Sequence, residues 1–270
     1  MRYQQLDVIP AASFSYIDVA LTSPLPPLCE WVQCLWATNR SNPHLLDLEE
    51  KLYPDAGTSL TFEIHDHHVN ARYFHNTQVL THRWDLSKRY IGIRFRPGGA
   101  TALLGDAVNE VQNADIDLLD LALPQRDHLQ RLMDHLPKLT SVQQIGAVEH
   151  WLAGLIPEAH QPAYPLSAVL TESSKTLLPP QQLADRIGLT RRTLERHFRR
   201  HLGFTPNQVH NFAQIKQARR QLITSAAGLS EIALDCGYFD QAHFTNAFRQ
   251  HTFETPRQYR LRKLSQISNE

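Results

Sequence analysis

Apolar and polar residues alternate along several short runs in the first part of the chain, between about residues 28 and 113. In the run Leu60–Ile64 every second residue is apolar, and the same holds for Val69–Tyr73 and Ile91–Phe95. Alternation with a period of two places the apolar side chains on one face of a β-strand. Stretches rich in Asp, Gly, His and Pro separate these runs and are typical of turns. The pattern therefore predicts short, half-buried strands that form a cupin-like β-barrel or a sandwich.

Between about residues 115 and 156 the apolar spacing changes to that of amphipathic helices. Apolar residues recur three or four positions apart, which predicts two antiparallel helices over residues 126–136 and 140–156. One interpretation is that these helices cover the end of the barrel, and the other is that they pair two subunits. Residues 1–27 are expected to be irregular because they end in a proline-rich stretch, and Gln161–Pro165 is expected to be a linker.

An internal repeat occupies the last third of the chain. The segment Leu183–Gly188 recurs as Ile232–Gly237, which lies 49 positions later. Each copy is followed by two apolar residues spaced four apart and by a Thr-Pro pair, and these later elements recur with an offset of 50. The copies are therefore in register apart from one residue added in the second turn. The later elements are Leu194, Phe198, Thr205 and Pro206 in the first copy, and Phe244, Phe248, Thr255 and Pro256 in the second.

Each copy contains the parts of a helix-turn-helix unit. A short helix is followed by Gly188 or Gly237, which permits a sharp turn, and then by the helix cap Thr190 or Asp240. In the first copy the polar side of the second helix is rich in Arg, which suits phosphates and guanine edges in a major groove. Pro206–Thr224 is predicted to form a connecting helix of about 27 Å. Such a helix would hold two recognition helices roughly 34 Å, or one DNA turn, apart.

Charge is divided unevenly along the 270 residues. Residues 1–162 hold 12 Lys and Arg against 19 Asp and Glu, a net charge of −7, whereas residues 163–270 hold 15 against 8, a net charge of +7. A basic second half indicates a polyanionic partner. Three cysteines are too few for a disulfide framework, and neither a signal peptide nor a membrane-spanning stretch is apparent, so we expect a cytoplasmic protein.

The repeat resembles the signature of AraC/XylS-type regulators over about residues 163–264. The resemblance is carried by Leu194-x-Arg196-x-Phe198-Arg199 and Gly203–Pro206 in the first copy, and by Gly237-Tyr238-x-Asp240-Gln241-x-His243-Phe244 and Thr255-Pro256-x-x-Tyr259-Arg260 in the second. It implies a seven-helix module that binds double-stranded promoter DNA, usually activates transcription by contacting RNA polymerase, and favours a homodimer. With the cationic outer side of the first unit, the expected DNA-binding residues are Arg191, Arg192, Glu195, Arg196, Arg199, Arg200, Gln241, Ala242, His243, Thr245, Asn246 and Arg249.

Two positions depart from that family pattern. Members typically have Arg where this chain has Asn246, and often Gly where it has Phe253. Because Asn binds adenine but neutralises no phosphate, the second unit is expected to hold DNA more weakly or to prefer an A·T pair there. Phe253 is expected to pack against Tyr259.

The first domain, residues 1–122, resembles more loosely the cupin-like sensor domains of one branch of these regulators. Tyr53-Pro54-Asp55, the strand up to His65 and Gly92–Ala100 carry this resemblance. Arg94 and Arg96 share one strand face, so they either clamp the carboxylate or phosphate of a small-molecule effector or make surface ion pairs. Trp84 is one of several aromatic residues that either line an effector pocket or pack the core. Residues 123–160 form the helical region.

Five histidines between His65 and His82 raise the alternative of a cupin-type metal-dependent enzyme with an accessory DNA-binding module. His65, His67 and His68 straddle a predicted turn and are expected to point to different faces, so a surface cluster is favoured over a metal site. Cys29 and Cys34 are expected to be buried thiols rather than a redox sensor. Cys236 is placed on the apolar side of a short helix, which argues against an alkyl-accepting repair function. We therefore expect no catalytic residue, no metal and no cofactor.

Overall fold

The computed structural model describes residue 9 and residues 19–38, 47–159 and 166–267. Its N-terminal part contains a six-stranded antiparallel sheet in the order β1-β2-β7-β4-β5-β8 and a two-stranded sheet formed by β3 and β6. The expected linker Gln161–Pro165 lies outside the described residues. The strands are β1 (Val19–Thr22), β2 (Val32–Thr38), β3 (Asp47–Leu52), β4 (Thr58–Ile64), β5 (Val69–Phe74), β6 (Leu80–Asp85), β7 (Arg89–Phe95) and β8 (Ile116–Asp117).

The three alternating runs of the sequence are confirmed as β4, β5 and β7. Their apolar positions face the same way across the sheet, as in the pairing of Leu60 with Ile93 and with Tyr73. One expectation is wrong. Residues 1–27 are not wholly irregular, because Val19–Thr22 pairs with the end of β2. The strand-rich region is also interrupted by a helix, α2 (Gly99–Leu104), which follows the Pro-Gly-Gly turn and is buried throughout.

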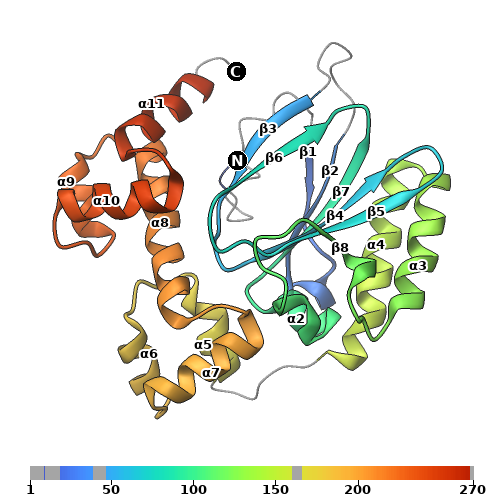
Figure 1. The fold of residues 1–270 in the computed structure, drawn as a ribbon, viewed down its shortest axis with the longest axis horizontal. Coiled ribbons are helices and arrows are strands. Elements are labelled where there is room, and N and C mark those ends of the chain that lie inside the picture. Colours follow the sequence, from blue (N-terminus) through green and yellow to red (C-terminus); the bar gives the residue numbers. More distant parts are fainter. Residues whose placement is uncertain (1–8, 10–18, 39–46, 160–165, 268–270) are drawn as a thin grey trace.

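One face of the six-stranded sheet packs against helices α3 (Arg126–His135) and α4 (Ser141–Leu155). Both helices stand beside the sheet in Figure 1. Leu129 and Leu152 are fully buried in the same core as Leu60, and the rings of Phe62 and Trp151 meet edge to face. The predicted helices are confirmed, and their apolar stripes are used inside this domain. Pairing of two subunits through those stripes would therefore expose the core.

The opposite face of the sheet meets the β3-β6 ribbon through aromatic side chains. The ring of Trp84 on β6 contacts Trp36 on β2 and Tyr90 on β7, with centroids 5.5 and 5.0 Å apart. His82 lies between Trp84 and Phe74, at 4.2 and 5.0 Å. Edge-to-face aromatic pairs at such distances stabilise packing beyond the area that they bury. The two sheets therefore form the expected barrel-like or sandwich-like layer pair, closed by an aromatic cluster.

The C-terminal part is entirely helical in its described residues. Two small cores, each built around one copy of the repeat, are joined by the 19-residue helix α8, which supplies apolar side chains to both. Figure 1 shows α8 running from the lower group of helices to the upper group. The helices are α5 (Leu166–Ser173), α6 (Pro180–Arg186), α7 (Arg191–Leu202), α8 (Pro206–Thr224), α9 (Leu229–Asp235), α10 (Gln241–Thr252) and α11 (Pro256–Ile267).

The loop between β3 and β4 lies against α8, so it forms a contact between the N-terminal and C-terminal domains. Ala56 is 1% exposed and belongs to the first helical core. The Tyr53 ring packs against the second core and lies 3.6 Å below the guanidinium carbon of Arg219 on α8. A second contact is made near α2, where the His75 ring meets Phe204 at 4.5 Å. The N-terminal domain therefore touches both helix-turn-helix units.

Candidate nucleic-acid interface

In the first copy of the repeat, α6 and α7 form a helix-turn-helix unit. Leu183 and Ala184 of α6 are buried against Leu194 of α7. Gly188, in the turn, has a positive φ of 66°, which glycine adopts without strain. The Thr190 hydroxyl then accepts a hydrogen bond from the Thr193 amide at 3.2 Å and caps α7. The turn and the cap therefore sit where the sequence predicted them.

The second copy has the same local construction. Ile232 and Ala233 of α9 are fully buried, and Gly237 has a φ of 77°. A carboxylate oxygen of Asp240 accepts a hydrogen bond of 2.7 Å from the His243 amide and caps α10. Helices α7 and α10 are both 12 residues long and begin 50 positions apart. From their fourth residue onward, buried and exposed positions follow the same order, so the repeat seen in the sequence is a repeat of structure.

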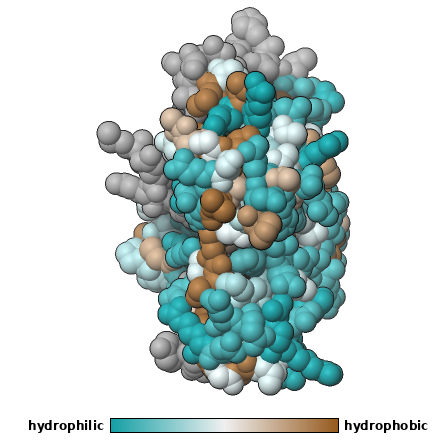
Figure 2. Space-filling view, turned by 90° about the vertical axis from the view of Figure 1, so that its left-hand side faces the viewer, coloured by the Kyte–Doolittle hydropathy of each residue, from teal (hydrophilic) through white to brown (hydrophobic). Residues whose placement is uncertain are grey.

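The outer sides of α7 and α10 carry the predicted DNA-binding residues. Three of these side chains are half-buried, namely Arg191, Glu195 and Thr245. The side of the molecule formed by the C-terminal helices is mostly hydrophilic (Figure 2). Five large apolar side chains are exposed on the described part of this helical domain, and Phe239, just before α10, is the most exposed of them at 86%. The exposed members of the set are Arg192, Arg196, Arg199, Arg200, Gln241, Ala242, His243, Asn246 and Arg249.

Several members of this set are held by neighbouring side chains. Arg191 donates a hydrogen bond of 2.8 Å to Asn207 at the start of α8. Arg199 pairs with Glu195 one turn earlier in α7, at 3.1 Å. Hydrogen bonds of this kind restrict rotamers, so these side chains lose less freedom when they meet DNA. A further example is in the second unit, where the Ser230 hydroxyl donates to the Gln241 amide oxygen at 2.7 Å.

The electrostatic potential on α7 is positive. Burial and then the charges of Arg196 and Arg200 lower the pKa of His197, which lies between them on the helix. The acidic Glu195 is balanced by its ion pair with Arg199. Neighbouring cations that disfavour another positive charge favour an anion at the same surface. This helix face is therefore suited to the phosphates of a nucleic acid.

The residues expected to bind a small molecule are not brought together as one site. Arg94 is enclosed, donates to the Ser59 hydroxyl at 2.8 Å and pairs with Asp55. Arg96 donates from Nε to the Cys29 carbonyl at 2.9 Å and lines a cleft next to the helical domain. Trp84 belongs to the aromatic cluster between the two sheets. The two arginines thus face the domain boundary, whereas Trp84 faces the interior of the barrel.

Histidines and cysteines differ in part from expectation. The rings of His65 and His68 stack at 3.9 Å across the β4-β5 turn, so they lie on one side and do not point to different faces. Among the described residues, no group of three or more His, Cys, Asp or Glu side chains is placed to hold a metal ion. Cys34 and Cys236 are buried, but Cys29 is exposed, contrary to the expectation of a buried thiol.

Phe253 does not pack as expected. It was expected to contact Tyr259, yet its side chain is 64% exposed and its backbone has a φ of 59°. It takes the left-handed position that ends α10, where the first copy has Gly203 with a φ of 72°. Tyr259 packs instead against Phe248 and Tyr53.

Residues that join the two domains were not identified from the sequence. In the sequence, Tyr53 and Asp55 are marked only by a family resemblance, and no pattern marks Lys175 or Lys216. Their partners lie far away in the chain, as for Tyr53 and Glu254, which are 201 positions apart. The only local signal was the Asp-Ala-Gly turn, which marks a loop but does not reveal what the loop contacts.

Two family models match the chain. Residues 183–262 match a family described as "Helix-turn-helix domain", and residues 21–117 match a "Domain of unknown function (DUF6597)". The first match covers both repeat copies, and the second covers most of the strand-rich domain. Within the described residues, no helix is both long and apolar enough to cross a membrane.

Two transcription regulators and one DNA-binding domain are each similar to part of this chain. The HTH-type transcriptional activator RhaS of Pectobacterium carotovorum is 37% identical over 83 residues, which are 31% of this chain and 30% of RhaS. The HTH-type transcriptional regulator ArgR of Pseudomonas aeruginosa is 28% identical over 155 residues, 54% of this chain and 46% of ArgR. This chain thus spans between 30% and 46% of the length of these two relatives. The DNA-binding domain of AdpA, crystallised with a target DNA, is 27% identical, with 40% of this chain and all of that one covered and a TM-score of 0.37.

Proposed function

We propose that this protein, which belongs to the AraC/XylS type of regulators through its C-terminal helix-turn-helix domain, binds promoter DNA sequence-specifically and regulates transcription. The observation that carries the proposal is the equivalence of α7 and α10. Both helices begin after a glycine turn and a side-chain cap, bury the same positions and expose the same polar side. A protein with two such helices joined by α8 is built to enter two successive major-groove segments.

Exposed cations on α7 supply the strongest DNA contacts in this proposal. Arg192 and Arg196 are exposed and make no hydrogen bond or ion pair within the described part of the chain, so they can reach bases without first breaking one. Arg199, Arg200 and Arg249 neutralise phosphates, which gives affinity and salt dependence. On α10 the polar set His243, Thr245 and Asn246 reads bases with fewer charges. The first unit therefore contributes more of the affinity, and the second more of the discrimination.

The N-terminal domain modulates DNA binding in this proposal. Its β3-β4 loop contacts α8, the helix that joins the two reading units, so a change in the loop reaches both. An effector that binds this domain would act through that contact. By analogy with relatives that are named transcriptional activators, we propose activation through RNA polymerase by a cytoplasmic homodimer. We propose no enzymatic reaction for the chain.

The proposal is tested with DNA sites selected from a random-sequence pool by the full-length protein. Fluorescence anisotropy then compares wild type with Arg196→Ala and with Arg131→Ala, an exposed arginine on α3 that serves as a matched charge control. Loss of a base contact costs about 1–3 kcal/mol, so Arg196→Ala should weaken specific binding about tenfold or more. Arg131→Ala should bind like wild type. Equal affinity for selected and scrambled DNA would contradict the proposal.

A further inference from the structure

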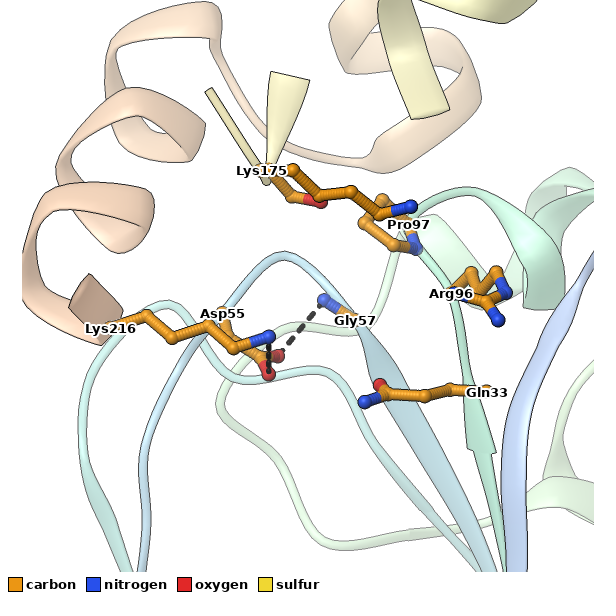
Figure 3. Close-up of a pocket in the computed structure, with 8 residues that line it drawn as sticks. Gln33, Asp55, Gly57, Arg96, Pro97, Lys175 and Lys216 are labelled. Carbon is orange, nitrogen blue, oxygen red and sulfur yellow. Dashed lines mark hydrogen bonds and ion pairs between the residues drawn. The ribbon is translucent and has the colours of Figure 1, made fainter. Parts of the chain in front are cut away.

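A cleft lies where the N-terminal domain meets α8 and the end of α5. It is lined by Gln33 of β2, Asp55 and Gly57 of the β3-β4 loop, and Arg96 and Pro97 after β7, and from the helical domain by Ser174, Lys175 and Lys216. It is small and open to solvent. Figure 3 shows Lys175 on one side of this space, Arg96 and Gln33 on the other, and Lys216 reaching Asp55 from α8.

The charges around the cleft are unbalanced. Among the described residues that line it, Arg96, Lys175 and Lys216 contribute three positive charges against one carboxylate, that of Asp55. That carboxylate is already engaged: one oxygen accepts from the Gly57 amide at 3.1 Å and pairs with the enclosed Arg94, and the other lies 3.9 Å from the Lys216 ammonium. The lining therefore holds a surplus of about two positive charges, with Asp55 turned toward its own partners.

Donor groups of several kinds surround this surplus. Arg96 uses Nε for the Cys29 carbonyl, which leaves its two terminal nitrogens as the donors that face outward. The Ser174 hydroxyl adds a neutral donor to the same lining. A phosphate group carries about 1.5 to 2 negative charges at pH 7 and several acceptor oxygens, whereas a carboxylate carries one charge and two oxygens. The number of charges and donors thus matches phosphate better.

We propose that this cleft binds the phosphate group of a small ligand, either inorganic phosphate or a phosphorylated metabolite. Because Arg96 belongs to one domain and Lys175 and Lys216 to the other, the bound anion bridges the domains and stabilises their contact. Ligand that binds only this joined arrangement raises the melting temperature of the protein by mass action. Binding is measurable without DNA, so its outcome is independent of the proposed function.

The test is titration calorimetry and thermal unfolding of the full-length chain in a phosphate-free buffer at constant ionic strength. The probes are inorganic phosphate, glycerol 3-phosphate and acetate. Lys175→Gln removes one exposed cation of the cleft, and Lys138→Gln removes an exposed cation next to α3 as the matched control. Neither lysine makes a side-chain hydrogen bond or ion pair in the described residues, so both variants should fold.

We expect saturable phosphate binding, a higher melting temperature with phosphate, and at least fivefold weaker binding by Lys175→Gln but not by Lys138→Gln. Tighter binding of glycerol 3-phosphate than of inorganic phosphate would identify a phosphorylated metabolite as the ligand, and the reverse order would identify the free ion. The proposal is overturned if acetate binds as well as phosphate, if no probe binds saturably, or if both variants bind phosphate like wild type.

Discussion

The hydroxyl of Tyr53, in the β3-β4 loop, donates a hydrogen bond of 3.0 Å to the carboxylate of Glu254, at the start of the last helical segment. The same carboxylate accepts from Arg262 at 2.7 Å and from Lys51 at 3.1 Å. Burial alone would raise the pKa of Glu254, but the hydrogen bonds from these partners outweigh it and hold the pKa below its ordinary value. Glu254 is thus a charged acceptor shared by both domains.

Removing the Tyr53 hydroxyl should weaken this contact. Tyr53→Phe keeps the ring under Arg219 but removes the hydrogen bond to a largely enclosed carboxylate and the one that the hydroxyl accepts from Arg262, which costs about 1–3 kcal/mol. Urea unfolding of the full-length protein measures the loss. Tyr238→Phe is the control, because that hydroxyl makes no hydrogen bond among the described residues. Equal stability of the two variants would show that the shared carboxylate does not hold the domains together.

Gly203 ends α7 at a place where the N-terminal domain comes close. An added Cβ would meet the Cε1 atom of His75 at 2.3 Å, and the backbone has a φ of 72°. Gly188, with a φ of 66°, has no atom within 4 Å of such a Cβ. Both Gly→Ala variants should lose about 1 kcal/mol from left-handed strain. Gly203→Ala should lose clearly more by thermal unfolding, and a loss equal to that of Gly188→Ala would mean that the domains are not in contact there.

Phe253 occupies the equivalent position in the second unit, between Thr252 and Glu254, which Lys51 of the N-terminal domain contacts. Its side chain is 64% exposed, so replacing it sacrifices little burial, while glycine adopts a φ of 59° freely. Phe253→Gly should therefore stabilise the protein by about 0.5–1 kcal/mol despite the greater freedom of glycine in the unfolded chain. Differential scanning calorimetry would show this as a higher melting temperature. A lower one would indicate that the phenyl ring has a contact that outweighs the strain.

Acid should loosen the boundary between the domains. Burial lowers the pKa of His75 below its ordinary value of 6.5, and its Nδ1 atom lies 3.2 Å from the Val108 carbonyl. The folded state binds a proton on His75 more weakly than the unfolded chain does. The contribution of neutral His75 to the free energy of unfolding is therefore complete above pH 6.5 and declines as the pH falls below it.

His75→Phe keeps a ring against Phe204 and removes the titration. Urea unfolding at pH 7.5, 6.5 and 5.5 should then show a smaller loss of stability with acid than in wild type, whereas His128→Phe, at an exposed site on α3, should leave the pH profile unchanged. The same slope in all three proteins would assign the acid sensitivity to other buried histidines, such as His82 or His251.

Asn246 lies on the exposed side of α10, at a position where the family pattern that the sequence resembles has Arg. Asn246→Arg adds one cation that faces outward, so DNA affinity should rise and the slope of log K against log salt should steepen by about one. Discrimination at the contacted base pair should fall if Asn246 reads an adenine. Anisotropy titrations between 50 and 200 mM salt measure both effects, and the affinity should rise about tenfold. The variant Asn246→Ala separates loss of the amide from gain of the charge. An unchanged salt slope would place position 246 away from the phosphates.

The helical domain was the more predictable part because its signals are local. Gly188, Thr190 and Asp240 act within a few residues of the turns and caps that they form, so their spacing in the sequence is their spacing in the structure. The strands β4, β5 and β7 were found for the same reason. The contacts of Tyr53 and Asp55 depend on how two separate domains meet, which no local pattern encodes. The predicted packing of Phe253 was wrong because a residue type that usually packs inward lies here at a position that is set by backbone geometry.

One consequence concerns truncated forms of the protein. Phe204 belongs to the first helix-turn-helix unit, yet one side of its ring is covered by His75 from the other domain. Cutting the chain between the domains would turn this side to water together with the surface that Ala56 now covers. An isolated C-terminal fragment should therefore be less soluble than the full-length protein and more prone to self-association at high concentration.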